Sequence, residues 1–330
     1  MGKIKKDRVL ITGVAGFIGS NLAKLMVKEG YKVTGIDNLS QGAKRNISGF
    51  EKTGSFDFIK ADVRDHEGLK KRFKGCRFDY IVHLAAFKIP RYGNAMDTLM
   101  INSKGTESML DIARDKKAKF VFASTSDVYG KNAKLPFSET SDLVIGPSSV
   151  KRWAYAVSKM FDEHLCFAYQ EKYGVESVII RFFGGYGANQ NTTWWGGPQS
   201  VFIDCALNNK PMTLHGDGSK TRSFTYIDDT VRGVYLATVS PDSGGEIFNI
   251  GNDREITIRG LAEMIWKMVR GNTKPKIKII PYDALSKGYE DVMRRIPDIS
   301  KAEKMLGFRA VVQLEGGLPL TIQWQKGISG

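Results

Sequence analysis

The chain has 330 residues, of which 42% are hydrophobic and 25% are charged, and its formal net charge at pH 7 is +14. This balance is typical of a folded globular protein and excludes a disordered chain, while the 35 glycines follow no period that would indicate a collagen-like or coiled-coil rod. The positive charge leaves three kinds of partner open: nucleic acid, an anionic membrane surface, or small polyanionic substrates.

The first half of the chain alternates short apolar runs with stretches at helical spacing. The apolar run 9–11 ends in Thr12-Gly13 and precedes a helix at 17–28. Further strands are expected at 33–36, 56–60, 80–84, 120–123 and 177–180, with helices near 65–74, 97–116 and 155–173. This alternation predicts βαβ units and therefore an α/β fold, a Rossmann-type doubly wound parallel sheet.

The character of the sequence changes after about residue 185. Glycine, proline and tryptophan crowd residues 184–198, which predicts a long loop, and shorter elements follow, including helices near 258–270 and 299–306. We predict an NAD-binding part at 1–184, which includes the helix with Tyr155 and Lys159, and a smaller α/β substrate-binding part at 185–330. Strands and helices are allowed to exchange between the two parts.

A glycine-rich turn, Gly13-Val14-Ala15-Gly16-Phe17-Ile18-Gly19, joins the first strand to the first helix. Glycines there let the backbone approach a pyrophosphate, and the helix N-terminus supplies N–H groups and a positive dipole end. The spacing is GxxGxxG rather than GxGxxG, and Asp37 follows Gly19 by 18 residues, at the end of the second strand. A carboxylate at that position binds a ribose 2′-OH and repels a 2′-phosphate, so NAD is favoured, although Lys44 and Arg45 leave NADP open.

The segment Tyr155-Ala156-Val157-Ser158-Lys159 places a phenol and an ammonium group one helical turn apart. A free tyrosine titrates at about 10, and a neighbouring Lys⁺ favours its phenolate, so Tyr155 is a candidate acid/base. The segment Ser124–Gly130 supports this interpretation of Tyr155 and Lys159. It follows the carboxyl end of a strand, where ligands bind in open α/β sheets. Thr125 is then placed to hydrogen-bond the same substrate oxygen as Tyr155.

These motifs, in this order, resemble the extended short-chain dehydrogenase/reductases that act on nucleotide-sugars. The resemblance covers nearly the whole chain. Beyond the motifs already described it includes Asp37–Ser40, Asp62-Val63, His83–Ala86, Asn102 with Gly105-Thr106, Gly216–Gly218 with Thr221–Phe224, and Arg294–Ala302.

The resemblance implies NAD as cofactor and a nucleotide-sugar as substrate. Tyr155 would take the proton of a sugar 4-OH with the help of Thr125, and Arg222 with Arg294 or Arg295 would bind the substrate's diphosphate. One position departs from the family: Gly184 stands where an Asn usually contacts the phosphate side of the substrate. The residues implied to bind the cofactor are Gly13, Gly16, Phe17, Ile18, Gly19, Asp37, Asn38, Asp62, Val63, Leu84, Ala85, Ala86, Lys88, Asn102, Tyr155 and Lys159.

The triplet Thr125-Ser126-Asp127 bears on which reaction follows. Every branch of the family first makes a 4-keto sugar. At this position dehydratases carry a triplet similar to Thr-Asp-Glu and decarboxylases one similar to Thr-Ser-Glu, whereas many epimerases carry small or uncharged residues after the Thr. Ser126 and Asp127 are therefore candidate catalytic residues, although Asp127 has the alternative role of ordering the loop. The pair Arg152-Trp153 is similar to the residues that decarboxylases carry before the tyrosine. The segments 37–40 and 216–224, in contrast, resemble those of UDP-sugar 4-epimerases at least as closely as those of decarboxylases.

We expect a UDP-sugar 4-epimerase, with UDP-glucuronate decarboxylase and NDP-glucose 4,6-dehydratase as alternatives. An NAD- or RNA-binding protein without activity is the alternative from another class. The unusual pair Trp194-Trp195 either stacks on a base or sugar, or serves loop packing or a subunit contact.

The remaining expectations concern partners and surroundings. The four histidines show no HxxxH or HExxH spacing, so no metal site is expected, and the scattered Lys and Arg residues predict no nucleic-acid partner. No stretch approaches 18 apolar residues, so no membrane span is expected. Three cysteines without CxxC spacing and no recognisable signal peptide predict a cytoplasmic protein. The apolar content of the helices near 97–116 and 155–173, together with the resemblance, predicts a homodimer.

Overall fold

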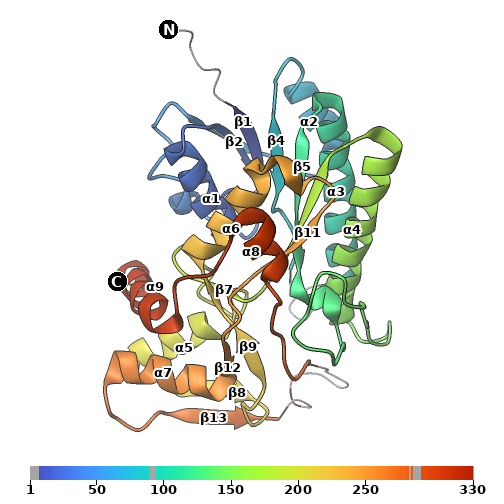
Figure 1. The fold of residues 1–330 in the computed structure, drawn as a ribbon. Helices are drawn as coiled ribbons and strands as arrows, with labels where there is room; N and C mark the ends of the chain where they lie inside the picture. Colours follow the sequence, from blue (N-terminus) through green and yellow to red (C-terminus); the bar gives the residue numbers. More distant parts are fainter. Residues whose placement is uncertain (1–6, 89–93, 282–283, 285–290, 330) are drawn as a thin grey trace.

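The computed structural model describes residues 7–88, 94–281, 284 and 291–329. Its centre is a seven-stranded sheet in the order β11-β6-β5-β4-β1-β2-β3, in which every neighbouring pair is parallel (Figure 1). This confirms the expected Rossmann-type fold. The strands are β1 (Arg8–Thr12), β2 (Lys32–Asp37), β3 (Phe56–Lys60), β4 (Tyr80–His83), β5 (Lys119–Thr125), β6 (Ser177–Phe182) and β11 (Ile247–Ile250).

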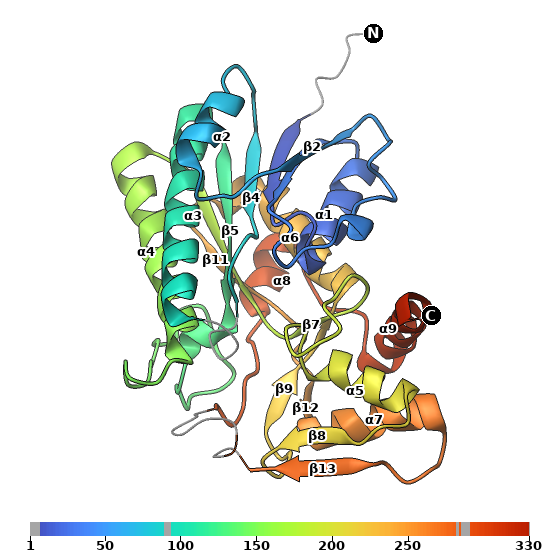
Figure 2. The same ribbon diagram turned by 180° about the vertical axis from the view of Figure 1, so that it is seen from behind.

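Helices cover both faces of this sheet, which is why its inner strands are apolar on both sides. Four of the five residues of β1 are buried, and five of the six in β6. Figures 1 and 2 show α2, α3 and α4 on one face and α1, α6 and α8 on the other. Their bounds are α1 (Phe17–Lys28), α2 (His66–Arg72), α3 (Ala95–Lys116), α4 (Trp153–Tyr173), α6 (Ile227–Val239) and α8 (Ser300–Leu306).

The rest of the chain forms a smaller part below the carboxyl ends of the strands (Figure 2). Among the described residues it contains three two-stranded sheets, β10-β7, β12-β9 and β13-β8, packed with three helices. The strands are β7 (Gly185–Tyr186), β8 (Met212–His215), β9 (Thr221–Ser223), β10 (Thr225–Tyr226), β12 (Glu255–Thr257) and β13 (Ile277–Ile280). The helices are α5 (Pro198–Leu207), α7 (Ile258–Arg270) and α9 (Leu314–Ser329). None of the described helices combines the length and apolarity that crossing a bilayer requires.

The two parts share elements. Strand β11 lies far along the chain yet pairs with β6 at the edge of the central sheet, and α6 packs on α1. The division at residue 184 stays a prediction. The loop expected at 184–198 is present for most of its length, interrupted by β7 and ended by α5, which begins at Pro198. Proline suits the first turn of a helix because no intrahelical partner for its nitrogen is needed there.

Candidate active site

A cavity of about 770 Å³ lies at the carboxyl ends of the central strands and extends into the smaller part. It brings together nearly all of the predicted site residues. Every predicted cofactor ligand except Asn102 lines it, and so do Thr125, Ser126, Asp127, Arg222 and Arg295.

The glycine turn between β1 and α1 is shaped for a closely approaching ligand. Gly13 has φ of +68°, and a Cβ placed on it would lie 2.9 Å from the backbone nitrogen of Ala85. A Cβ on Gly19 would collide with the carbonyl oxygen of Gly13. Gly16, the N-cap of α1, offers no side-chain cap to the helix N-terminus. The turn therefore fits a pyrophosphate such as that of NAD, bound by backbone N–H groups.

Asp37 ends β2 as a buried carboxylate that faces the cavity. It accepts hydrogen bonds from the backbone N–H of Ala15 at 3.0 Å and of Leu39 at 2.7 Å. Burial raises the pKa of this carboxyl, and the two backbone hydrogen bonds oppose that rise. Nearby, the amide of Asn38 donates to Asp62 at 3.0 Å, which fixes the two side chains expected beside the adenosine.

Tyr155 and Lys159 lie in α4 opposite Thr125, the last residue of β5. The Thr125 hydroxyl is close enough to the Tyr155 phenol to affect its pKa. Burial raises the pKa of the Tyr155 phenol, the charge of Asp127 raises it further, and the Thr125 hydroxyl opposes both. Lys159 is buried with its ammonium 4.5 Å from the ring centre of Phe122, and burial lowers its pKa. The phenol therefore needs the Lys159 charge, and any further positive charge, to act as a base.

Asn102 does not line the cavity, contrary to its predicted place along the cofactor. Its side chain accepts from the backbone N–H of Phe87 at 2.8 Å and donates to the Ser158 hydroxyl at 3.0 Å. Asn102 thus ties the segment after β4 to α4, and it acts on the site by fixing Phe87 and its neighbour Lys88.

A buried ion pair behind Thr125 was not anticipated from the sequence. Glu163, one turn after Lys159, accepts from Arg181 Nε at 3.0 Å and Nη2 at 2.6 Å, and both side chains are about 95% buried, with exposures of 5% and 4%. The Ser124 hydroxyl also donates to Glu163. The only signal in the sequence is an arginine within an apolar strand and a carboxylate on the buried face of a helix.

Charged side chains crowd the corner of the cavity next to Thr125. Asp127 pairs with Arg295 and lies 3.5 Å from Arg152. On the other side, Asp291 lies 3.1 Å from Arg152 and 2.9 Å from Arg222. We call these five residues, together with Lys220, the arginine corner.

Positive charge exceeds negative charge in the arginine corner, which has three arginines and one lysine but two carboxylates. Burial by itself would raise the pKa of Asp127, but Arg295, Arg152 and Arg222 hold it below its usual range. Burial and the charge of Arg295 lower the pKa of Arg222 to about 10, so it stays charged at neutral pH. The corner is therefore suited to an anionic group of a ligand.

Arg294 and Gly184 lie differently from the family pattern. Arg294 does not line the cavity; it pairs with Glu255 at 2.8 Å and faces a separate surface groove, so it is not brought together with Arg222 and Arg295. A Cβ on Gly184 would collide with the carbonyl oxygen of Ser223. The close approach of β9 thus leaves no room at this position for the Asn of the family.

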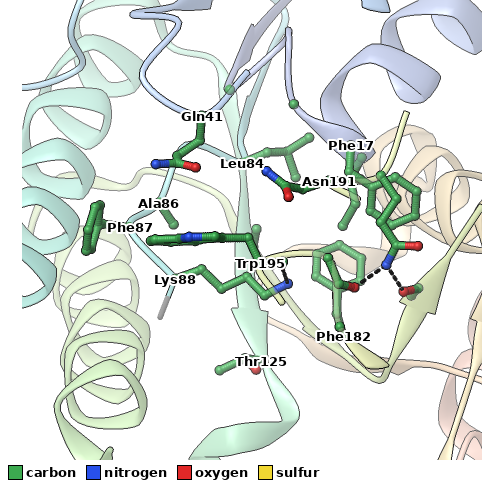
Figure 3. A pocket seen from close by; sticks show the side chains of 18 of the residues that line it. Phe17, Gln41, Leu84, Ala86, Phe87, Lys88, Thr125, Phe182, Asn191 and Trp195 are labelled. Atoms are coloured by element: carbon green, nitrogen blue, oxygen red, sulfur yellow. Dashed lines mark hydrogen bonds between the residues drawn. The ribbon is translucent and has the colours of Figure 1, made fainter. Parts of the chain in front are cut away.

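The two tryptophans also line the cavity, from the loop before α5. Trp194 stacks on His215 with ring centres 4.9 Å apart, while Trp195 meets Phe87 and points into the cavity (Figure 3). Within the described ranges, no group of three or more His, Cys, Asp or Glu side chains is arranged to hold a metal ion.

Comparisons with known proteins agree with this geometry. A family model described as GDP-mannose 4,6 dehydratase matches residues 10–321. The chain is 36% identical over 325 residues to a UDP-N-acetyl-alpha-D-glucosaminuronate decarboxylase of Bacillus cytotoxicus, which covers 97% of this chain and 98% of the relative. It is 35% identical over 321 residues to UDP-glucuronic acid decarboxylase 1 of Danio rerio, covering 97% and 72%. A crystal structure of UDP-glucuronic acid 4-epimerase from Bacillus cereus, with UDP-glucuronic acid and NAD, superimposes with a TM-score of 0.85 at 29% identity, covering 97% and 99%.

Proposed function

Because the chain belongs to the extended short-chain dehydrogenase/reductase family of nucleotide-sugar epimerases, dehydratases and decarboxylases, we propose that it is an NAD-dependent decarboxylase of a UDP-linked uronic acid. Two of its relatives in the sequence comparison carry decarboxylase names. The sequence motifs favour 4-epimerisation. The arginine corner is the structural observation that favours decarboxylation instead.

The position of the arginine corner supports a carboxylate on the sugar. Asp127 follows Thr125 by two residues, so Arg295 and Arg152, which pair with it, lie beside the reacting sugar. Arg222 lies farther along the corner with Asp291, where a diphosphate is the natural anion. A uronate offers both anions, whereas a neutral hexose offers only the diphosphate.

The chemistry begins at the sugar 4-OH. Thr125 and Tyr155 hold this hydroxyl, and Tyr155 accepts its proton while the Lys159 charge stabilises the phenolate. When bound, NAD⁺ supplies the hydride acceptor at C4. The glycine turn and Asp37 would hold the cofactor's pyrophosphate and ribose.

The 4-keto uronate is a β-keto acid, and its C5–C6 bond breaks without a metal. The bonding electrons pass to O4, where Tyr155 returns the proton, and CO2 leaves. The resulting enol takes a proton from solvent at C5, and return to C4 of the hydride that it gave up yields a UDP-pentose. We assign Arg295 and Arg152 to orient the carboxylate so that the breaking bond lies perpendicular to the carbonyl plane, and Asp127 to hold both guanidinium groups in place.

Epimerisation of the same substrate at C4 is the second candidate. It uses the same Thr125, Tyr155 and Lys159 and also requires binding of the uronate carboxylate. The uncharged Ser126 and the structural similarity to a UDP-glucuronic acid 4-epimerase favour it.

Proton NMR of the purified protein with UDP-glucuronate distinguishes the candidates. UDP-N-acetylglucosaminuronate, UDP-glucose and dTDP-glucose are tested in parallel. We expect release of CO2 and a UDP-pentose from a uronate and no reaction of the neutral sugars. Formation of the 4-epimer without CO2 would select epimerisation, and loss of water to a 4-keto-6-deoxy sugar would select dehydration.

We also propose that the protein is a homodimer that pairs through α3 and α4. These helices lie side by side on one flank (Figure 1), where Met96 is 60% exposed and Phe161 is 54% exposed. Exposed apolar side chains on adjacent helices are typical of a helical dimer interface. Light scattering should give twice the chain mass for the wild type and the monomer mass for Phe161→Glu; equal masses would contradict this proposal.

A further inference from the structure

Trp195 lines the active-site cavity and contacts the segment that follows β4. Its ring packs edge to face on Phe87, with ring centres 5.5 Å apart and planes at 76°. Its carbonyl oxygen accepts a hydrogen bond from Lys88 Nζ at 3.2 Å. Phe87 and Lys88 follow β4, whereas Trp195 precedes α5, so the contact joins two segments that are distant in the sequence.

Both ends of this contact are fixed by hydrogen bonds. On the Trp195 side, the carbonyl of Gly196 accepts from the side chains of Gln190 and Gln199, and the Gly196 N–H donates to Thr193 at 2.8 Å. On the other side, Asn102 holds the backbone N–H of Phe87. The backbone on both sides of the contact is therefore held in place, which lowers the entropy lost when a ligand packs against the indole.

The indole lines the same cavity as Thr125 and Tyr155, the residues that we assign to the sugar 4-OH. In Figure 3 the indole lies beside Phe87 and Lys88, and Ala86, Gln41 and Thr125 line the same cavity. A sugar with its 4-OH at Thr125 and Tyr155 has its ring in the space that Trp195 borders. The C–H bonds on one face of a pyranose form an apolar surface that packs well on an indole.

A fixed platform has a consequence for the reaction. Epimerisation at C4 requires the keto sugar to turn over, so that its opposite face meets the hydride donor. Decarboxylation requires no turn, because C4 is oxidised and reduced on the same face. A ring held against the indole is prevented from turning while its carboxylate leaves.

We propose that Trp195 is the specificity-determining residue of this site: it is a platform for the sugar ring that suppresses C4 epimerisation. The proposal rests on the proposed function, since it concerns the fate of the same 4-keto sugar. Trp194 is separate from it, because that ring stacks on His215 and packs against Phe202 in α5.

The test compares wild type with Trp195→Ala and Trp195→Phe, and uses Tyr173→Ala as a control. Tyr173 is an exposed aromatic residue at the end of α4 that does not line the cavity. With UDP-glucuronate as substrate, the readouts are KM, kcat and the fraction of products inverted at C4, measured by proton NMR. Trp195→Ala should raise KM about tenfold and give C4-inverted product as about a tenth of the total, and Trp195→Phe should restore most of both.

Each result bears on the proposal. An unchanged KM in Trp195→Ala overturns the platform, and a raised KM without inverted product overturns its control of the reaction. Should the variant turn over too slowly, calorimetry replaces kinetics: it should bind UDP as wild type does and UDP-glucuronate about tenfold more weakly, and equal losses for both ligands refute the platform. If the wild type releases no CO2, the proposed function fails instead, and the same comparison of UDP with the UDP-sugar that binds still tests Trp195.

Discussion

The buried pair Glu163–Arg181 should be a main determinant of both stability and catalytic geometry. Replacing Glu163 with Gln leaves the Arg181 guanidinium buried without a counter-charge, while the Ser124 hydroxyl loses a charged acceptor. Breaking a buried pair by removing one partner costs about 3–5 kcal/mol. At about 2.1 cal/mol/K of unfolding entropy per residue, a chain of 330 residues has about 0.7 kcal/mol/K, so the unfolding midpoint should fall by about 4–7 °C.

The assay is thermal unfolding followed by circular dichroism, with Glu171→Gln as the matched control. Glu171 lies on the same helix but is exposed, so its substitution should change stability by no more than about 0.5 kcal/mol. Arg181→Met should destabilise the chain similarly, and the double variant Glu163→Leu/Arg181→Met should be less damaging than the sum of the single variants. A midpoint for Glu163→Gln within about 1 °C of wild type would refute the reasoning.

Three further predictions concern the site. Tyr155→Phe should lower turnover by roughly 10²–10⁴-fold in the NMR assay with an unchanged circular dichroism spectrum, and a rate within tenfold of wild type would contradict its acid/base role. Asp127→Asn should lower CO2 release by about 10²-fold or more, because it frees Arg295 and Arg152 from their shared partner, while Asp142→Asn, at an exposed site, should not. Burial raises the pKa of Asp162 to about 6, against the opposing effects of Lys159 and Thr106. The folded chain therefore keeps a proton that the unfolded chain loses between about pH 4 and 6, and this contribution to stability is lost as pH rises through about 6. In equilibrium unfolding, the free energy of unfolding of Asp162→Asn minus that of wild type should rise by about 2–3 kcal/mol between about pH 4 and about pH 8. A difference in unfolding free energy that stays constant with pH would count against this.

The central fold was predictable because its signals are local. Strands β1, β4, β5 and β6 each contain a short apolar run, and a parallel sheet buried on both faces requires such runs. The strand at 247–250 was not found, because its place beside β6 depends on a contact with residues about 70 positions earlier. Helix α4 begins at Trp153 rather than Tyr155, a difference within the ordinary uncertainty of helix ends.

The candidate site was predictable where a single short motif supplies the residues that bind one part of the ligand. The glycine turn, Asp37, Thr125, Tyr155 and Lys159 all line the cavity. The arginine corner was only partly seen, because Arg152, Arg222 and Arg295 come from three distant segments and sequence spacing does not show which of two adjacent arginines faces inward. The contact of Trp195 with Phe87 likewise could not be predicted, because Phe87 lies more than 100 positions earlier in the chain.

The pairing of β11 with β6 also constrains how the protein is made. A ribosome that has released residues 1–184 has produced six of the seven strands, with the edge of β6 exposed although most of its side chains are apolar. That edge stays open until residue 250 has emerged, and an unpaired apolar edge is a site for aggregation. Fragments cut near residue 184 should therefore be poor stand-alone cofactor-binding modules, and circular permutants opened between β6 and β11, which place the two strands farther apart in the sequence, should fold more slowly than the natural order.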